Sequence, residues 1–144
     1  MDIDAKAILS AQEEIEVGAP PEKVWSELTG IERWSEWRPG VSTAKLEGGL
    51  AVGSVFRWKA NGLPIVSAIR ELEPQKRIGW TGRSPGTKAS HLWLLEPAAG
   101  GGTRVVTRES MAGWFPRLLK LFAPGFLSKT LAASLRALKA RAEG

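Results

Sequence analysis

The chain has no cysteine, and this absence excludes several kinds of chemistry at once. Without a thiol there is no disulfide, no thiol nucleophile, no iron–sulfur cluster and no thiolate zinc site. Histidine is almost as scarce, because His91 is the only one among 144 residues. A transition-metal site would need carboxylates for nearly every ligand. We therefore expect neither a metal ion nor another cofactor.

Long apolar runs are also missing. No segment reaches the roughly 18 to 20 consecutive apolar residues that cross a bilayer. The first ten residues carry Asp2 and Asp4, whereas a secretion signal begins with positive charge. These observations predict a cytoplasmic protein without stable membrane insertion.

Charge is unevenly distributed along the chain, although the net charge is only +5. Residues 1–47 carry 10 acidic and 5 basic side chains, and residues 48–144 carry 5 acidic and 15 basic ones. A basic half can bind nucleic acid or an anionic membrane. Here the bases are scattered, with no run longer than two, which favours a solvated surface. We expect no nucleic-acid partner.

Tryptophan is abundant where tyrosine is absent: the chain has seven tryptophans and no tyrosine. The hydrophobic fraction of 43% and the charged fraction of 24% are typical of a globular chain. A chain of this length buries about two-thirds of its surface, enough for a core and one internal cavity. We expect residues 1–144 to form a single ligand-binding domain.

Alternation of apolar and polar residues predicts a mainly extended chain with two short helices near its start. A first strand over 6–17 ends at Pro20-Pro21, and a helix then runs to Thr29-Gly30. A second short helix begins at Ile31 and ends before Pro39-Gly40. Further strands are predicted at 42–47, 54–60, 64–73, 76–83, 87–96 and 103–112. For 64–73 the alternation does not indicate which face is buried.

The last part of the chain has helical periodicity. Two leucine- and phenylalanine-rich stripes flank Pro124-Gly125, which should kink or break the helix. Consecutive strands followed by one amphipathic helix are typical of an α+β fold. We predict a curved antiparallel sheet of about seven strands wrapped around a long C-terminal helix. A single helix cannot fill the concave face of a twisted sheet everywhere, so a cavity should remain between them.

Several segments carry a family resemblance, which covers about residues 10–142. They are residues 15–25, 34–39, 72–80, 91–97, 101–105 and 109–113. Together they resemble the START-like superfamily SRPBCC, the helix-grip fold of polyketide cyclase/dehydrase-like and lipid-transfer proteins. The resemblance implies a seven-stranded sheet that grips the C-terminal helix around a cavity for a hydrophobic or amphipathic small molecule.

Aromatic side chains are the candidate ligand contacts, because indole rings offer flat apolar faces and one N–H donor each. Their alternative role is core packing. The predicted contacts are Trp34, Trp37, Phe56, Trp58, Trp80, Trp93, Thr107, Phe122 and Phe126. Among them we expect Trp93→Ala to weaken ligand binding more than it destabilises the fold.

His91 and Glu109 are the candidate catalytic pair. The glycine-rich loop at 98–102 should pair their strands as a hairpin and place both side chains on one face. Such a pair can transfer protons, or it can be structural, with Glu109 meeting an arginine near the rim.

The resemblance, together with these residues, implies three possible functions. The first is binding or transport of a small hydrophobic ligand, favoured by the apolar inner faces and the lack of tyrosine. The second is a polyketide cyclase, aromatase or dehydratase that uses Glu109 and His91. The third is a protein-interaction domain similar to the activators of heat-shock ATPases. That third function needs an exposed apolar patch, which the sequence does not reveal, and the oligomeric state is not predicted.

Overall fold

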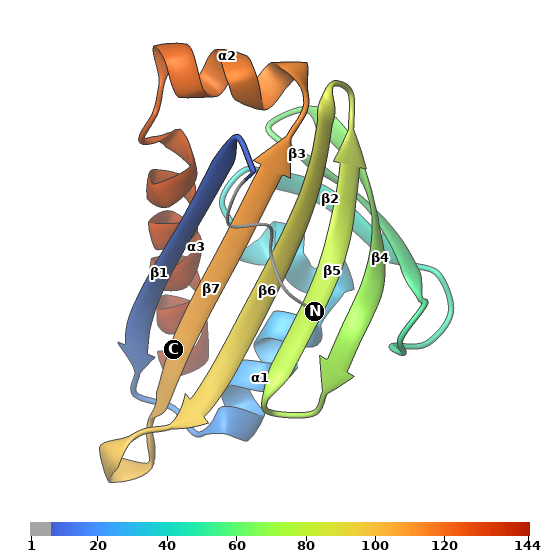
Figure 1. The fold of residues 1–144 in the computed structure, drawn as a ribbon. Helices are drawn as coiled ribbons and strands as arrows, with labels where there is room; N and C mark the ends of the chain where they lie inside the picture. Colours follow the sequence, from blue (N-terminus) through green and yellow to red (C-terminus); the bar gives the residue numbers. More distant parts are fainter. Residues whose placement is uncertain (1–6) are drawn as a thin grey trace.

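The computed structural model describes residues 7–144, which form one antiparallel sheet with helices on its concave side (Figure 1). The strands lie in the order β1-β7-β6-β5-β4-β3-β2. In chain order the elements are β1 (Leu9–Val17), α1 (Pro21–Thr29), η1 (Ile31–Glu36), β2 (Val41–Leu46), β3 (Val55–Ala60), β4 (Leu63–Glu73), β5 (Arg77–Ser84), β6 (Thr87–Pro97), η2 (Ala99–Gly101), β7 (Thr103–Ala112), α2 (Trp114–Phe122) and α3 (Phe126–Glu143). The predicted α+β helix-grip fold is confirmed. The first strand begins at Leu9, and residue 6 of its predicted range lies outside the described residues.

The helices close the two ends of the curved sheet differently (Figure 1). α3 runs along β1 and β7, α1 lies at the end near the C-terminus, and α2 crosses the opposite end. The predicted helix therefore consists of two helices, which meet at 93° around Pro124-Gly125. Proline cannot continue the backbone ladder of α2, so the chain turns there.

A glycine fixes the start of α2. Gly113 has a φ of +124°, and a side chain there would overlap the carbonyl of Gly86. The same carbonyl accepts the backbone N–H of Phe115 at 3.2 Å. The close approach of these two backbone segments anchors α2 to the turn between β5 and β6.

A β-bulge explains why alternation could not assign the faces of β4. Ile69 pairs with Trp80 and Leu72 pairs with Ile78, so Arg70 is an extra residue between them. Before the bulge Ile65, Ser67 and Ile69 face inward, and after it the inward position shifts to Leu72.

Two hydrophobic clusters occupy the space between sheet and helices. The larger cluster lies at the end closed by α1 and η1, and it includes Trp34, Phe56, Trp80, Trp93, Leu135 and Leu138. The smaller cluster lies towards α2 and consists of Leu9, Leu127 and Leu131, with Ala11, Met111 and Leu119 packed against them.

Trp34 is central in the larger cluster. Its ring centroid lies 5.3 to 5.5 Å from those of Phe56, Trp58 and Trp80. Its indole N–H donates to the carbonyl of Leu28 at 3.0 Å, which satisfies the one polar atom of the ring.

Within residues 7–144, no single helix has the length and apolar character needed to cross a membrane. Only α2 and α3 taken together meet those two criteria, across their 93° bend.

Candidate functional site

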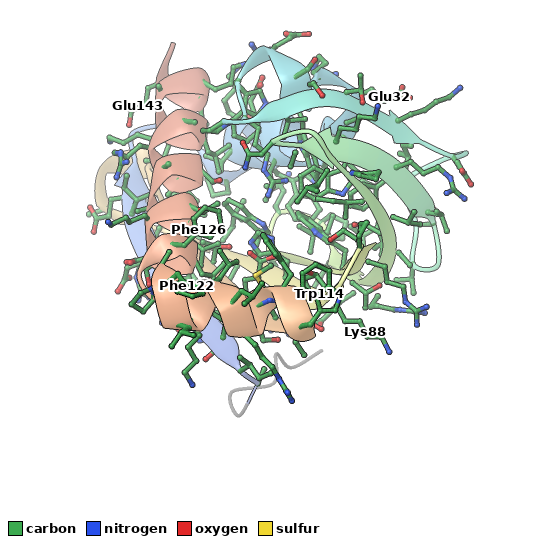
Figure 2. The ribbon with its side chains drawn as sticks, turned by 90° about the horizontal axis from the view of Figure 1, so that it is seen from above. Glu32, Lys88, Trp114, Phe122, Phe126 and Glu143 are labelled. Atoms are coloured by element: carbon green, nitrogen blue, oxygen red, sulfur yellow. The ribbon has the colours of Figure 1, made fainter. Side chains whose placement is uncertain are left out.

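A cavity of about 520 Å³ separates the sheet from α2 and α3. This volume falls within the range of small-molecule sites, roughly 300 to 1,000 Å³. Figure 2 looks over α2 towards it, with Trp114 and Phe122 at opposite ends of that helix. Its lining residues are Arg38, Pro39, Val41, Trp58, Ala60, Asn61, Leu63, Ile65, Ser84, Thr87, Glu109, Met111, Phe115, Leu119, Phe126, Leu127, Thr130 and Ser134.

Two of the predicted aromatic contacts line this cavity, and the others lie elsewhere. Trp58 and Phe126 form part of its wall. Trp34, Phe56, Trp80 and Trp93 are almost completely buried in the larger cluster, and Trp37 packs against that cluster. Trp80 also lines a small neighbouring pocket of about 70 Å³, which shares Trp58 and Glu109 with the cavity.

Trp93 and Phe122 were both predicted as ligand contacts, but neither lines the cavity: one is buried in the core and the other is exposed. Trp93 has no exposed surface and lies outside the lining, so we now expect Trp93→Ala to reduce stability first. Phe122 is 77% exposed and also lies outside the lining, because the bend at Pro124-Gly125 leaves it on the outer side of α2.

His91 and Glu109 are adjacent, as the hairpin predicts. They are direct cross-strand partners on β6 and β7, with Nδ1 of His91 3.5 Å from Oε2 of Glu109. Glu109 lines both the cavity and the small neighbouring pocket, whereas His91 lines the small pocket alone. Glu109 is therefore the member of the pair that a ligand would meet.

Thr107 orients His91. Its hydroxyl lies 2.7 Å from Nε2 of His91 and donates to the carbonyl of Leu92 at 3.3 Å. Because the hydroxyl proton is used in that bond, Nε2 carries the imidazole proton and Nδ1 presents a lone pair to Glu109. Thr107, predicted as a ligand contact, is fully buried and makes these structural bonds.

Burial shifts the pKa of both members of the pair towards the neutral form. It holds the pKa of His91 well below its usual value, and the positive charge of Arg38 lowers it further. Burial raises the pKa of Glu109 to about 7, although Arg38 acts in the opposite direction. Near neutral pH, His91 is uncharged and Glu109 exchanges a proton readily.

Arg38 is the functional candidate that sequence reasoning missed. It follows η1, and its guanidinium carbon lies 4.4 Å from the ring centroid of Trp34 and 4.8 Å from that of Trp58. Trp80 and Trp93 are 5.8 and 6.0 Å away. These four rings form an aromatic cage, whose π faces stabilise the cation. They come from η1, β3, β5 and β6, so no local pattern indicates them.

The cation in the aromatic cage is deeply buried. Arg38 is only 8% exposed, and its Nη1 has no hydrogen-bond partner among the described residues. Burial lowers the pKa of Arg38 to about 10, so the side chain stays charged at neutral pH. Thr87 also lines the cavity, and its buried hydroxyl has no hydrogen-bond partner among residues 7–144.

No group of three or more histidine, aspartate or glutamate side chains in residues 7–144 is arranged to hold a metal ion.

The outer face of α2 carries an exposed apolar patch, formed by Trp114, Leu118, Leu121 and Phe122. The sequence did not reveal it, because helical periodicity indicates an apolar stripe but not how much of it is covered. Since α2 crosses the end of the fold, only Phe115 and Leu119 of this helix line the cavity. Residues 110–142 contain six basic and no acidic side chains, so the patch lies in a positively charged region.

Comparison with known proteins identifies relatives of this fold. A structure of the hypothetical protein jhp0584 from Helicobacter pylori is 20% identical, with a TM-score of 0.86 over 96% of this chain and 90% of the other. The Zhui aromatase/cyclase from Streptomyces sp. R1128 is 18% identical, with a TM-score of 0.79 over 93% of both chains. A START superfamily protein from Mycobacterium smegmatis is 19% identical, with a TM-score of 0.75 over 93% of this chain and 97% of the other.

These structural similarities show the fold, whereas a match to a sequence family is more specific. No curated protein sequence matches the chain significantly. Residues 9–143 match the family described as "Polyketide cyclase / dehydrase and lipid transport". This range covers nearly the whole chain, so the protein belongs to the polyketide cyclase/dehydrase and lipid transport family.

Proposed function

We propose that the protein binds a small hydrophobic molecule in the cavity between the sheet and helices α2 and α3. The observation that carries this proposal is the lining, which is mainly apolar and includes a few convergent polar groups. That combination is characteristic of small-molecule sites. The family description, which includes lipid transport, supports the same class of ligand.

Intrinsic fluorescence provides the test, because Trp58 lines the cavity. We would titrate the protein with fatty acids, sterols, flavonoids and polyketide-like aromatics. One class should give a saturable change in emission. Trp58→Phe should remove most of that change while calorimetry still detects binding. Trp25→Phe is the matched control, because Trp25 lies on α1 outside the lining.

A cavity-filling variant tests the location. Ser134 is buried on α3 and lines the cavity, so the ring of Ser134→Phe would occupy the space for the ligand. Ala140→Phe on the exposed side of α3 is the control. The proposal predicts that only Ser134→Phe loses binding, with both variants folded by circular dichroism. Full binding by a folded Ser134→Phe protein would contradict it.

The His91–Glu109 pair supports an enzyme as a second candidate function. A carboxyl group with a pKa of about 7 at the cavity surface is suited to proton transfer near neutral pH. In closure of a poly-keto chain, the Glu109 carboxylate would remove a proton from a carbon between two carbonyls. The resulting carbanion would attack a carbonyl carbon, and Glu109 would return the proton to the new alkoxide.

Turnover of a poly-keto substrate by the wild-type protein, lost in Glu109→Gln while ligand binding persists, is the expected result for this enzyme. Full activity in Glu109→Gln would remove Glu109 from the mechanism.

The exposed apolar patch on α2 supports the third candidate, an interaction domain similar to heat-shock ATPase activators. The protein should then stimulate the ATPase activity of a heat-shock ATPase. Leu121→Ser combined with Phe122→Ser should abolish that stimulation, and absence of stimulation by the wild-type protein would exclude this function.

A further inference from the structure

We infer that the ligand of this cavity is an amphipathic acid, whose carboxylate is bound by Arg38 in the aromatic cage. This inference rests on the proposed binding function and specifies its ligand class.

The first argument is the unused hydrogen-bonding capacity of Arg38. The arginines at positions 77, 104 and 141 each form ion pairs with glutamates. Arg38 forms none with any side chain in residues 7–144, although it is far more buried than these three. A buried donor without an acceptor is unfavourable, so an acceptor supplied by a ligand would be bound strongly.

The second argument is the charge of the lining. Among residues 7–144, Arg38 and Glu109 are the only charged residues in the lining, and His91 behind Glu109 is neutral. Because Glu109 is about half ionised at pH 7, the site carries a net positive charge on average. An anionic group would neutralise this charge, whereas an ammonium group would be repelled by Arg38.

The third argument concerns the kind of anion. The aromatic cage holds the planar guanidinium in one orientation, and this group matches a carboxylate with two parallel hydrogen bonds. Thr87 belongs to the same lining, and its hydroxyl has no hydrogen-bond partner among the described residues. Along α2 and the start of α3 the wall is apolar, formed by Phe115, Leu119, Phe126 and Leu127, and Thr130 and Ser134 follow further along α3. The arrangement therefore fits one acidic end and one apolar body.

The experiment compares three probes with the same ten-carbon chain: decanoate, 1-decanol and decylamine. Calorimetry at pH 6 should show decanoate binding at least about tenfold more tightly than decanol, because a charge-assisted hydrogen bond contributes that much or more. Decylamine should bind most weakly. In Arg38→Met, decanoate and decanol should bind equally. Arg136→Met removes the same charge from an exposed position on α3 and should keep the preference.

A change of pH provides a second readout that does not depend on replacing Arg38. From pH 6 to pH 8 Glu109 becomes ionised, so decanoate affinity should fall several-fold while decanol affinity stays constant. Decanoate itself is ionised throughout this range. Glu109→Gln should remove the pH dependence. Arg38→Lys, which keeps the charge but loses the planar fork, should show an intermediate preference for decanoate.

The outcomes separate the two proposals. Equal affinity for decanoate and decanol, or tightest binding of decylamine, overturns the carboxylate site and leaves hydrophobic ligand binding intact. A preference for decanoate that Arg38→Met retains also overturns it. Failure of all three probes and of the wider ligand panel overturns the proposed function, and the carboxylate site with it.

Discussion

The two ends of the concave face are built from different residues. At the end closed by α1 and η1, the ring of Phe56 packs edge-on against those of Trp34 and Trp80, and all three have almost no exposed surface. At the end crossed by α2, the smaller cluster has three buried aliphatic side chains, and α2 leaves most of its apolar face exposed. The cavity lies where the aromatic packing stops. One end is a base of buried aromatic rings, and the other is a cover with few buried side chains.

The largest effect should come from the aromatic end. Trp34→Ala removes a fully buried ring and its hydrogen bond to Leu28, so we expect a loss of about 3 to 5 kcal/mol in the free energy of unfolding. Trp114→Ala, at a position 62% exposed on α2, should change it by less than about 0.5 kcal/mol. Urea denaturation of both variants measures the difference. Similar losses in the two would show that the ends are equally well packed.

Two leucines on one face of α3 compare the clusters directly. Leu131 belongs to the smaller cluster and Leu135 to the larger, and both are almost fully buried. Leucine-to-alanine substitutions cost about 2 to 5 kcal/mol, and the cost depends on how far the neighbours can relax. We expect Leu135→Ala to cost about 1 kcal/mol more than Leu131→Ala, because side chains beside the cavity have more room to move.

The same denaturation measurement applies to this pair. A larger loss for Leu131→Ala would mean that the α2 end is the more tightly packed of the two.

The pH dependence of stability reports on Glu109, which lines the cavity between the two ends. The pKa of Glu109 is about 7 in the folded chain against 4.5 for an unperturbed side chain. Between these values the folded chain holds a proton that the unfolded chain has released, so this contribution to stability is lost as pH rises from 4.5 to 7. We expect about 1 to 3 kcal/mol, because one pKa unit corresponds to about 1.4 kcal/mol and the Glu109 side chain is 17% exposed.

Comparison with Glu109→Gln separates this contribution from that of His91. His91, whose pKa is lowered, makes stability fall as pH drops below about 6.5, which is the opposite direction. Both proteins contain His91, and its effect on the difference between them has the opposite sign to the effect of Glu109. The stability of wild type relative to Glu109→Gln should therefore decrease from pH 5 to about pH 7 and level off towards pH 8. A constant difference would show that Glu109 titrates normally.

The sequence predicted the strands and helices better than it predicted which side chains face the cavity. Alternation of apolar and polar residues located the strands, and Pro124-Gly125 predicted the break in the C-terminal helix. The hairpin placed His91 beside Glu109, because pairing across a short loop is a local property. The aromatic cage around Arg38 was not predictable, because it joins four elements that are distant along the chain. The bulge at Arg70 shifted the faces of β4 without any change in composition.

The two phenylalanines that flank the bend give the smallest effect. Both were predicted as ligand contacts, but only Phe126 lines the cavity, while Phe122 lies outside it. Phe126→Ala should weaken decanol binding by about three- to tenfold, since it removes apolar surface worth roughly 1 kcal/mol from the wall. Phe122→Ala should leave affinity within twofold of wild type. Calorimetry on the pair measures the difference, and a larger loss in Phe122→Ala would mean that α2 turns its outer face to the ligand when the cavity is filled.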